Sequence, residues 1–268
     1  MNLRQELLEG LRRLNLTAMS EHVEETALRA AKETLTHEAF LLELVRMEQA
    51  AKHGRRVERL LKQSGLLPTK TFSSLQLKTF SPAIQMQIER LRDCRFVHEA
   101  VNVIAVGQPG TGKSHLACAL GRVLIDRGIP VSFSSTASLV QRLLLAKRDL
   151  RLPQEIAKLD RFDCLILDDI GYVQHDQDEM EVLFTLLAER YERKSVIITT
   201  NLVFSEWNQI FKNPLTTLAA IDRVVHHSII LDLTSVASYR AKAAVAAKAQ
   251  VRTVTGGTVP ALTAAAAE

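Results

Sequence analysis

The stretch GQPGTGKS, from Gly107 to Ser114, decides the fold class of this 268-residue chain. Its spacing is G-x-x-x-x-G-K-S, the pattern of a loop that holds phosphate groups. The apolar run VNVIAV before it is typical of a buried parallel strand, and SHLACALGRVLIDRG after it has the apolar spacing of a helix. Gly128 is a stop signal for that helix. The motif and both flanks together predict a site for a nucleoside triphosphate.

The residue types of this loop suit the chemistry. Gly110 and Gly112 lack side chains, so backbone N–H groups can converge on an anion at the positive end of the following helix. Lys113 can reach the β- and γ-phosphates, and Ser114 can offer its hydroxyl to Mg²⁺. The loop that we expect to hold ATP consists of Gly107, Gln108, Pro109, Gly110, Thr111, Gly112, Lys113 and Ser114.

A second acidic element is needed for Mg²⁺ and for the attacking water. The stretch CLILDDIG supplies one, because a strand-type apolar run is followed there by Asp168 and Asp169. We predict that Asp168 holds Mg²⁺ and that Asp169 orients or deprotonates water. The alternative is a pair of acids that only end a strand.

Composition limits the class of protein. Hydrophobic residues make up 47% and charged residues 24%, as in ordinary soluble proteins. No apolar run approaches the ~20 residues of a membrane span, and the N-terminus lacks the core of a signal peptide. Cys94, Cys118 and Cys164 suit neither a disulfide framework nor a zinc site, so we expect a cytoplasmic protein. The net charge of +4 permits nucleic-acid binding without establishing it.

The first part of the chain, residues 1–68, has a helical pattern and predicts a small all-helical domain. Leu3, Leu7, Leu11 and Leu14 form one apolar stripe. A longer helix is expected to begin after Thr36, a favourable N-cap, and to end at Gly65 and Pro68. The following LLPTKTFSSLQLKTFSP is rich in Ser, Thr and Pro and is interpreted as a linker.

From about residue 80, helices alternate with short apolar strands, which is typical of a parallel α/β sheet. The expected strands are Val103–Val106, Val131–Ser134, Cys164–Leu167, Val196–Thr199 and Ile229–Leu231. We assign residues 69–245 to this domain. Residues 246–268 have low complexity and are predicted to be a disordered tail.

These motifs, in this order, resemble the AAA+ ATPases of the helicase-loader and transposition-helper branch, in particular the IstB family, helpers of insertion-sequence transposases. The supporting stretches are NVIAVGQPGTGKSHLACALG, FDCLILDDIGY, VIITTN, AAIDRVVHHSIIL and SYR. The resemblance implies an AAA+ P-loop domain with a five-stranded parallel sheet, preceded by a helical domain. It also implies ATP binding, self-association on duplex DNA, and delivery or activation of a transposase.

The resemblance also implies roles for three further residues. Asn201, after the strand SVIITT, would sense the γ-phosphate; the alternative is a polar residue that turns the chain. Arg223 would be an arginine finger that reaches a neighbouring subunit's ATP, or else a surface arginine paired with Asp222. Arg240 would be a second nucleotide sensor. Because many AAA+ proteins have Asp-Glu where this chain has Asp-Asp, slow hydrolysis is expected.

Two basic stretches are candidates for contact with DNA phosphates. One follows the second expected strand, and an extra helix at this place in the initiator branch lines the DNA-facing side. The other lies on the long N-terminal helix. Either could instead be a solvated face. The candidate residues are Lys147, Arg148 and Arg151 in the first stretch, which we favour, and Arg55, Arg56 and Arg59 in the second.

Two other functions share some of these motifs. A replicative helicase loader would have the same ATP-site residues and would differ in its N-terminal partner domain. A small-molecule kinase would use the same P-loop, but it would need an acceptor pocket and an arginine-rich lid, neither of which is evident in the sequence.

Overall fold

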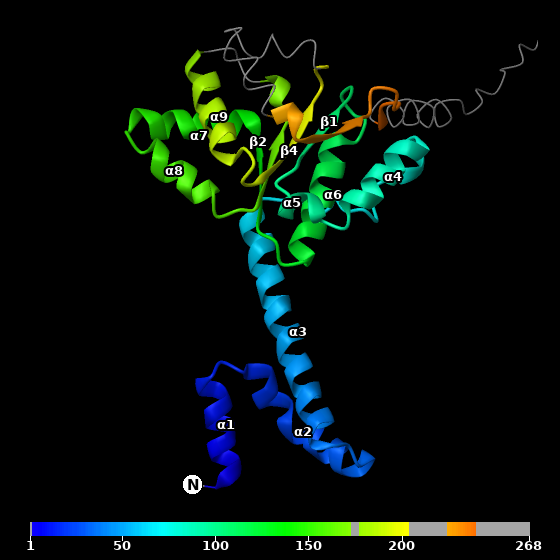
Figure 1. Ribbon diagram of the computed structural model, residues 1–268, viewed down its shortest axis with the longest axis vertical. Coiled ribbons are helices and arrows are strands. Elements are labelled where there is room, and N and C mark those ends of the chain that lie inside the picture. Colours follow the sequence, from blue (N-terminus) through cyan, green and yellow to red (C-terminus); the bar gives the residue numbers. More distant parts are fainter. Residues whose placement is uncertain (1, 173–176, 204–223, 240–268) are drawn as a thin grey trace, which may run out of the picture.

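The computed structural model describes residues 2–172, 177–203 and 224–239. A helical N-terminal region stands apart from an α/β domain, and one long helix joins them (Figure 1). No helix in these residues is long and apolar enough to cross a membrane. The elements in chain order are α1 Leu3–Arg13, α2 Thr17–Glu33, α3 His37–Ser64, η1 Leu77–Thr79, α4 Pro82–Leu91, α5 Arg95–His98, β1 Asn102–Val106, α6 Lys113–Asp126, β2 Val131–Ser135, α7 Thr136–Arg148, α8 Leu152–Leu159, β3 Cys164–Asp168, η2 Ile170–Tyr172, α9 Gln177–Arg190, β4 Ser195–Thr200 and β5 Ser228–Asp232.

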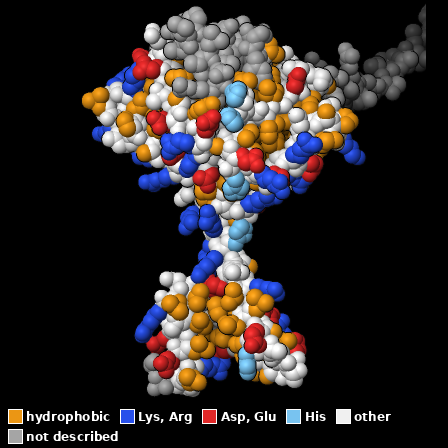
Figure 2. Space-filling view, in the orientation of Figure 1, with side chains coloured by type: hydrophobic (Ala, Val, Ile, Leu, Met, Phe, Trp, Pro, Cys, Tyr) orange, Lys and Arg blue, Asp and Glu red, His pale blue; other side chains and the backbone are white. Residues whose placement is uncertain are grey.

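The helical region consists of α1, α2 and the first part of α3. The predicted cap of α3 is confirmed, because the Thr36 hydroxyl accepts a hydrogen bond from the Ala39 amide at 3.2 Å. Gly65 ends the helix with a φ of +70°. The predicted leucine stripe of α1 is only partly buried: Leu11 lies in a small core, whereas Leu3, Leu7 and Leu14 are exposed. Figure 2 shows hydrophobic side chains gathered on the visible face of this region.

A buried carboxylate joins α2 to α3. Glu48 accepts a hydrogen bond from the Met19 amide at 3.1 Å and pairs with Arg55 at 3.3 Å. Burial opposes the charged form, but the amide hydrogens of Met19 and Ala18 and the charges of Lys52 and Arg55 outweigh it, so the pKa of Glu48 is lowered. The hydrogen bond to Met19 ties the first turn of α2 to the middle of α3.

The α/β domain is built on one sheet whose strand order is β2-β3-β4-β1-β5. All four strand pairs are parallel, and the inner strands β1, β3 and β4 are buried, largely apolar runs because helices cover both faces. One core packs α4, α5, α6 and the end of α3 on one face, and a second packs α7 and α9 on the other. The predicted α/β class and the five parallel strands are confirmed, and β4 lies between β3 and β1.

The end of α3 and the segment after it belong to the α/β domain. Leu60 is buried in the same core as α6, and Leu66 lies against Gly121 of that helix. In the segment interpreted as a linker, Leu75 and Phe80 are 7% and 3% exposed. The structure thus differs from the interpretation of this segment as a linker, because it packs on α6 and places residues beside the P-loop.

Candidate nucleotide-binding site

The P-loop connects β1 to α6 at the carboxyl edge of the sheet. Gly110 and Gly112 have φ angles of +85° and +98°, the left-handed region that glycine adopts without strain. A Cβ on Gly107 would lie 2.9 Å from the carbonyl carbon and oxygen of Leu233, so the chain after β5 leaves no room for a side chain there. The loop is therefore held in a shape that presents the first amides of α6.

Lys113 begins α6 and is only 8% exposed. Its ammonium group donates to the carbonyl oxygens of Gly107 at 2.6 Å and Gln108 at 3.0 Å. The cation is thus held within the loop by the backbone that precedes it. These two hydrogen bonds stabilise the buried positive charge and keep it beside the amides that a phosphate would contact.

The acidic pair lies at the carboxyl end of β3, two strands from the strand that leads into the P-loop: Asp168 ends β3 and Asp169 follows it. The Thr199 hydroxyl donates to Asp168 Oδ1 at 2.7 Å and accepts from the Asp169 amide at 2.9 Å. Thr199 lies on β4 and is fully buried. Asp169 has a φ of +65°, a left-handed conformation that is uncommon for aspartate. One hydroxyl therefore fixes the carboxylate of the first acid and the backbone of the second.

Asn201 comes directly after β4, which lies between β1 and β3. The preceding residue, Thr200, accepts a hydrogen bond from the Gly107 amide at 3.1 Å, so Asn201 starts beside the P-loop. Its Oδ1 is buried and has no hydrogen-bond partner among the described residues. Gly171 packs against this oxygen so closely that a Cβ there would collide with it. A buried acceptor of this kind can receive a hydrogen bond from a water molecule or from a protonated oxygen of a nucleotide.

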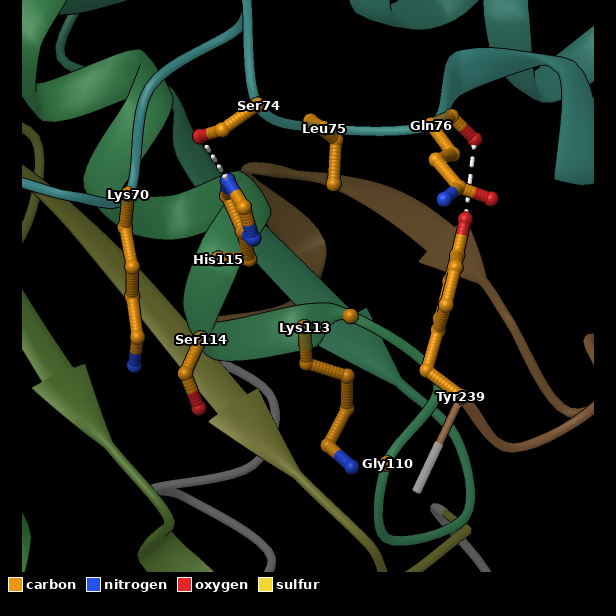
Figure 3. Close-up of a pocket in the computed structure, with 10 residues that line it drawn as sticks. Lys70, Ser74, Leu75, Gln76, Gly110, Lys113, Ser114, His115 and Tyr239 are labelled. Carbon is orange, nitrogen blue, oxygen red and sulfur yellow. Dashed lines mark hydrogen bonds between the residues drawn. The ribbon is translucent and has the colours of Figure 1, made fainter. Parts of the chain in front are cut away.

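A cavity of ≈ 320 Å³ opens over the N-terminal end of α6 (Figure 3). Its size falls in the range of small-ligand pockets. One side is the P-loop and the start of α6, and the facing side is the segment before η1, which Figure 3 shows crossing above Lys113 and Ser114. The lining residues are Lys70, Ser74, Leu75, Gln76, Gly110, Gly112, Lys113, Ser114, His115 and Tyr239.

Two residues that were not predicted as site residues connect the two sides of this cavity. The His115 Nε2 lies 3.0 Å from both the Thr71 carbonyl oxygen and the Ser74 hydroxyl, which fixes the facing segment on α6. On the other side, the Tyr239 hydroxyl donates to the Gln76 carbonyl at 3.1 Å. The Tyr239 amide donates to the Gly110 carbonyl at 2.9 Å. His115 belongs to no recognised motif, whereas Tyr239 lies in the stretch SYR that supports the family resemblance.

The residues present fit a nucleoside triphosphate with a divalent cation. Lys113, Ser114 and the N-terminal end of α6 line a cavity of sufficient size, and the Asp168 carboxylate offers oxygen ligands of the kind Mg²⁺ takes. Arg223 and Arg240 lie outside the described residues, so their predicted roles stay predictions.

The basic residues proposed to contact DNA have different surroundings. Lys147 pairs with both Asp178 and Glu181 at 2.9 Å, and Arg56 Nε donates to the Gly128 carbonyl at 3.0 Å. Arg55 pairs with the buried Glu48. The remaining three are exposed and form no ion pair within the described part of the chain: Arg59, Arg148 and Arg151.

Comparison with known proteins places this site in a family. Residues 9–247 match the family model described as IstB-like ATP binding protein. A protein of Sinorhizobium fredii, named as an insertion sequence ATP-binding protein, is 44% identical over 78% of this chain and 70% of its own length. A protein of Pseudomonas aeruginosa, named for the ATP-binding protein of insertion sequence IS21, is 38% identical over 87% of both chains.

Solved structures agree on the fold. AMPPCP-bound DnaA from Aquifex aeolicus matches with a TM-score of 0.53 and 18% identity, over 63% of this chain and about half (51%) of that one. DnaI matches with a TM-score of 0.52 and 16% identity, over 60% of this chain and 89% of that one. These likenesses show an AAA+ P-loop fold. With that fold, the phosphate-binding loop at the edge of its sheet and a family match over most of its length, the chain belongs to the IstB-like ATP-binding proteins of insertion sequences.

Proposed function

We propose that this protein hydrolyses ATP, assembles on duplex DNA in its ATP-bound form, and there delivers or activates a transposase. The observation that carries the proposal is the convergence of the P-loop, Asp168, Asp169 and Asn201 at one edge of the sheet, in a chain whose relatives are named for insertion sequences. A replicative helicase loader has the same ATP-site motifs, but the names of these relatives favour transposition.

Each side chain has a distinct role in the proposed hydrolysis. Lys113 and the first amides of α6 bind the β- and γ-phosphates, and Ser114 and Asp168 would hold Mg²⁺, which would supply positive charge to the phosphate oxygens. Asp169 accepts a proton from the attacking water or orients it, and Asn201 senses the γ-phosphate. Arg223 comes from a neighbouring subunit, so hydrolysis depends on assembly, and Arg240 senses the bound nucleotide.

Two substitutions test the assignment of the site. Lys113→Ala removes the cation that offsets phosphate charge, so we expect most ATP binding to be lost. Asp169→Asn keeps Asp168 for Mg²⁺, so the variant should bind ATP and leave it uncleaved. A fluorescent-nucleotide titration and a phosphate-release assay measure the two effects. Asp169→Asn protein that hydrolyses ATP at the parental rate would overturn the role given to Asp169.

A mixing experiment tests whether Arg223 acts in trans. Arg223→Ala protein should bind ATP and fail to hydrolyse it, and Lys113→Ala protein should fail to bind. In a mixed assembly the intact P-loop of the first variant meets the intact arginine of the second, so part of the activity should return. No recovery at any ratio, with co-assembly on DNA confirmed, would contradict action in trans.

The DNA contact is proposed for the end of α7 and the turn after it. Of the two candidate stretches, the one on α3 has Arg55 and Arg56 tied to Glu48 and Gly128, whereas Arg148 and Arg151 are exposed without ion pairs among the described residues. Contacts to phosphates bind DNA without reading its bases, and they weaken steeply with salt. Changing Lys147, Arg148 and Arg151 to Ala should therefore weaken binding more than changing Arg55, Arg56 and Arg59. The reverse ranking at matched salt would move the site to α3.

The exposed leucines of the helical region support contact with another protein chain. Leu3, Leu7 and Leu14 are 82%, 49% and 69% exposed, and an apolar surface of this kind is typical of interaction sites. We propose that this region serves the protein partners, namely the transposase and further copies of the chain, while the α/β domain holds ATP and DNA.

A further inference from the structure

The turn after α7 contains a leucine in a position that suits glycine. The Leu150 amide donates to the Lys147 carbonyl at 3.1 Å, and the Arg151 amide donates to the Ala146 carbonyl at 2.7 Å. This pair of bonds is a Schellman motif, in which the residue at the place of Leu150 is left-handed and most often glycine. Leu150 has a φ of +57°, which costs a residue with a Cβ about 1 kcal/mol or more.

The fold gains no packing from this side chain. Leu150 is 88% exposed, more than any other large hydrophobic residue in the described part of the chain. The residue after it, which in such motifs often makes an apolar contact with the helix, is Arg151. Glycine at position 150 would relieve the backbone strain and remove the exposed apolar surface. Because leucine is unfavourable here in both respects, its side chain is best explained by a contact outside this chain.

The neighbours of Leu150 indicate the chemistry of that contact. Arg148 and Arg151 flank it, are exposed, and pair with no acid among the described residues, against the single carboxylate of Asp149. The next basic residue, Lys147, is neutralised by Asp178 and Glu181. Figure 2 shows hydrophobic and basic side chains together at the edge of the α/β domain where Figure 1 places α7 and α8.

From this arrangement we infer that Leu150 is an apolar wedge that enters a base step of duplex DNA from the minor groove, while Arg148 and Arg151 bind the backbone or groove edge on either side. Proteins that kink DNA insert leucine, methionine or phenylalanine in this way and place basic groups beside it. A wedge responds to how easily a step unstacks and not to the identity of the bases, which suits sequence-tolerant binding. The inference rests on the proposed DNA binding and adds a bend to it.

Substitutions at Leu150 separate the wedge from the fold. Asparagine and glycine both accept the left-handed turn but carry no apolar wedge, so Leu150→Asn and Leu150→Gly should be at least as stable as the parent in a thermal melt. Both should bind duplex DNA about fivefold or more weakly with ATP present, the loss expected for a central contact. Leu150→Met keeps an apolar side chain of similar size and should retain binding.

The readouts are fluorescence anisotropy for affinity, energy transfer between the duplex ends for bending, and 2-aminopurine fluorescence for unstacking. We expect Leu150→Asn and Leu150→Gly to lower the DNA affinity, the energy transfer between the duplex ends and the 2-aminopurine fluorescence. Leu150→Met should leave all three at the parental level. Met86→Ala, which removes a 58% exposed apolar side chain from α4 of the α/β domain, is the matched control and should behave as the parent.

The outcomes are distinguishable. If Leu150→Asn bends and binds DNA as the parent does, the wedge is wrong and DNA binding stands. If its DNA affinity is unchanged but self-assembly or transposase contact is lost, Leu150 contacts a protein and the wedge is again wrong. If the parent protein fails to bind duplex DNA with ATP, the proposed function fails, and the wedge fails with it.

Discussion

Thr199 offers a sharp test of how β4 supports the ATP site. Its hydroxyl is fully buried and bonds to the Asp168 carboxylate at 2.7 Å and to the Asp169 amide at 2.9 Å. Thr199→Val keeps the shape of the side chain and removes both bonds. A hydrogen bond to a charged group contributes about 1.5–3 kcal/mol and a neutral one about 1, so we expect unfolding to become easier by about 2–4 kcal/mol.

The matched control is Thr200→Val, the same change at the next position of the same strand. Thr200 is equally buried, but its hydroxyl bonds only to backbone groups of Leu202, at 3.0 and 3.4 Å. This variant should lose about 1–2 kcal/mol of unfolding free energy, because both partners are neutral and the bond at 3.4 Å is long. Thr199→Ser, which keeps the hydroxyl, should remain close to the parent.

The nucleotide assay separates a role at the Mg²⁺ site from general weakening of the fold. ATP affinity is measured with Mg²⁺ and with chelator, and unfolding free energy is measured in urea. Loss of a group that orients a metal ligand typically costs tenfold or more in metal affinity, so the gain in ATP affinity from Mg²⁺ should fall by about tenfold in Thr199→Val. If Mg²⁺ raises the ATP affinity of Thr199→Val as much as that of Thr200→Val, Thr199 does not orient Asp168 for Mg²⁺.

Three further substitutions test other contacts in the structure. Gly107→Ala places a Cβ 2.9 Å from the Leu233 backbone, so it should weaken ATP binding and lower the thermal midpoint, as nucleotide titration and melting would show. Gly171→Ala displaces the Asn201 amide and should reduce hydrolysis while ATP binding persists; equal loss of both would contradict a separate role for Asn201. Glu48 has a lowered folded-state pKa, so its stabilisation is complete above the pKa of an unfolded-chain glutamate and is lost as pH falls through the lowered value. Glu48→Gln should be less stable than the parent near neutral pH, and the difference should shrink in acid, as urea titrations at several pH values would show.

The sequence predicted the elements that depend on local signals. All five strands begin and end within one residue of their expected bounds, because buried parallel strands are short apolar runs with polar ends. Thr36, Gly65 and Gly128 mark helix ends through capping chemistry that is visible in the residue types. Asp168 and Asn201 lie at the same edge because β3 and β4 are parallel and end on the same side.

Features that depend on distant contacts were not predictable in this way. The Ser- and Thr-rich segment before η1 has the composition of a linker, yet contacts with His115, some 40 residues later, dock it on α6. The pairing of Lys147 with Asp178 and Glu181 joins α7 to α9 across about 30 residues, so a basic run in the sequence is a weaker basic patch in the fold. No sequence motif predicts the two hydrogen bonds of the Thr199 hydroxyl, since they arise from the register between β3 and β4.

In the proposed function, ATP held by the P-loop switches the chain to a DNA-bound assembly, and one titration measures this switch. Anisotropy of a labelled duplex is followed against protein concentration, with and without MgATP, for the parent and for Lys113→Ala at matched salt. We expect tight binding only for the parent with MgATP, with an affinity that falls steeply as salt rises. Equal binding with and without ATP, or unimpaired binding by Lys113→Ala, would contradict it.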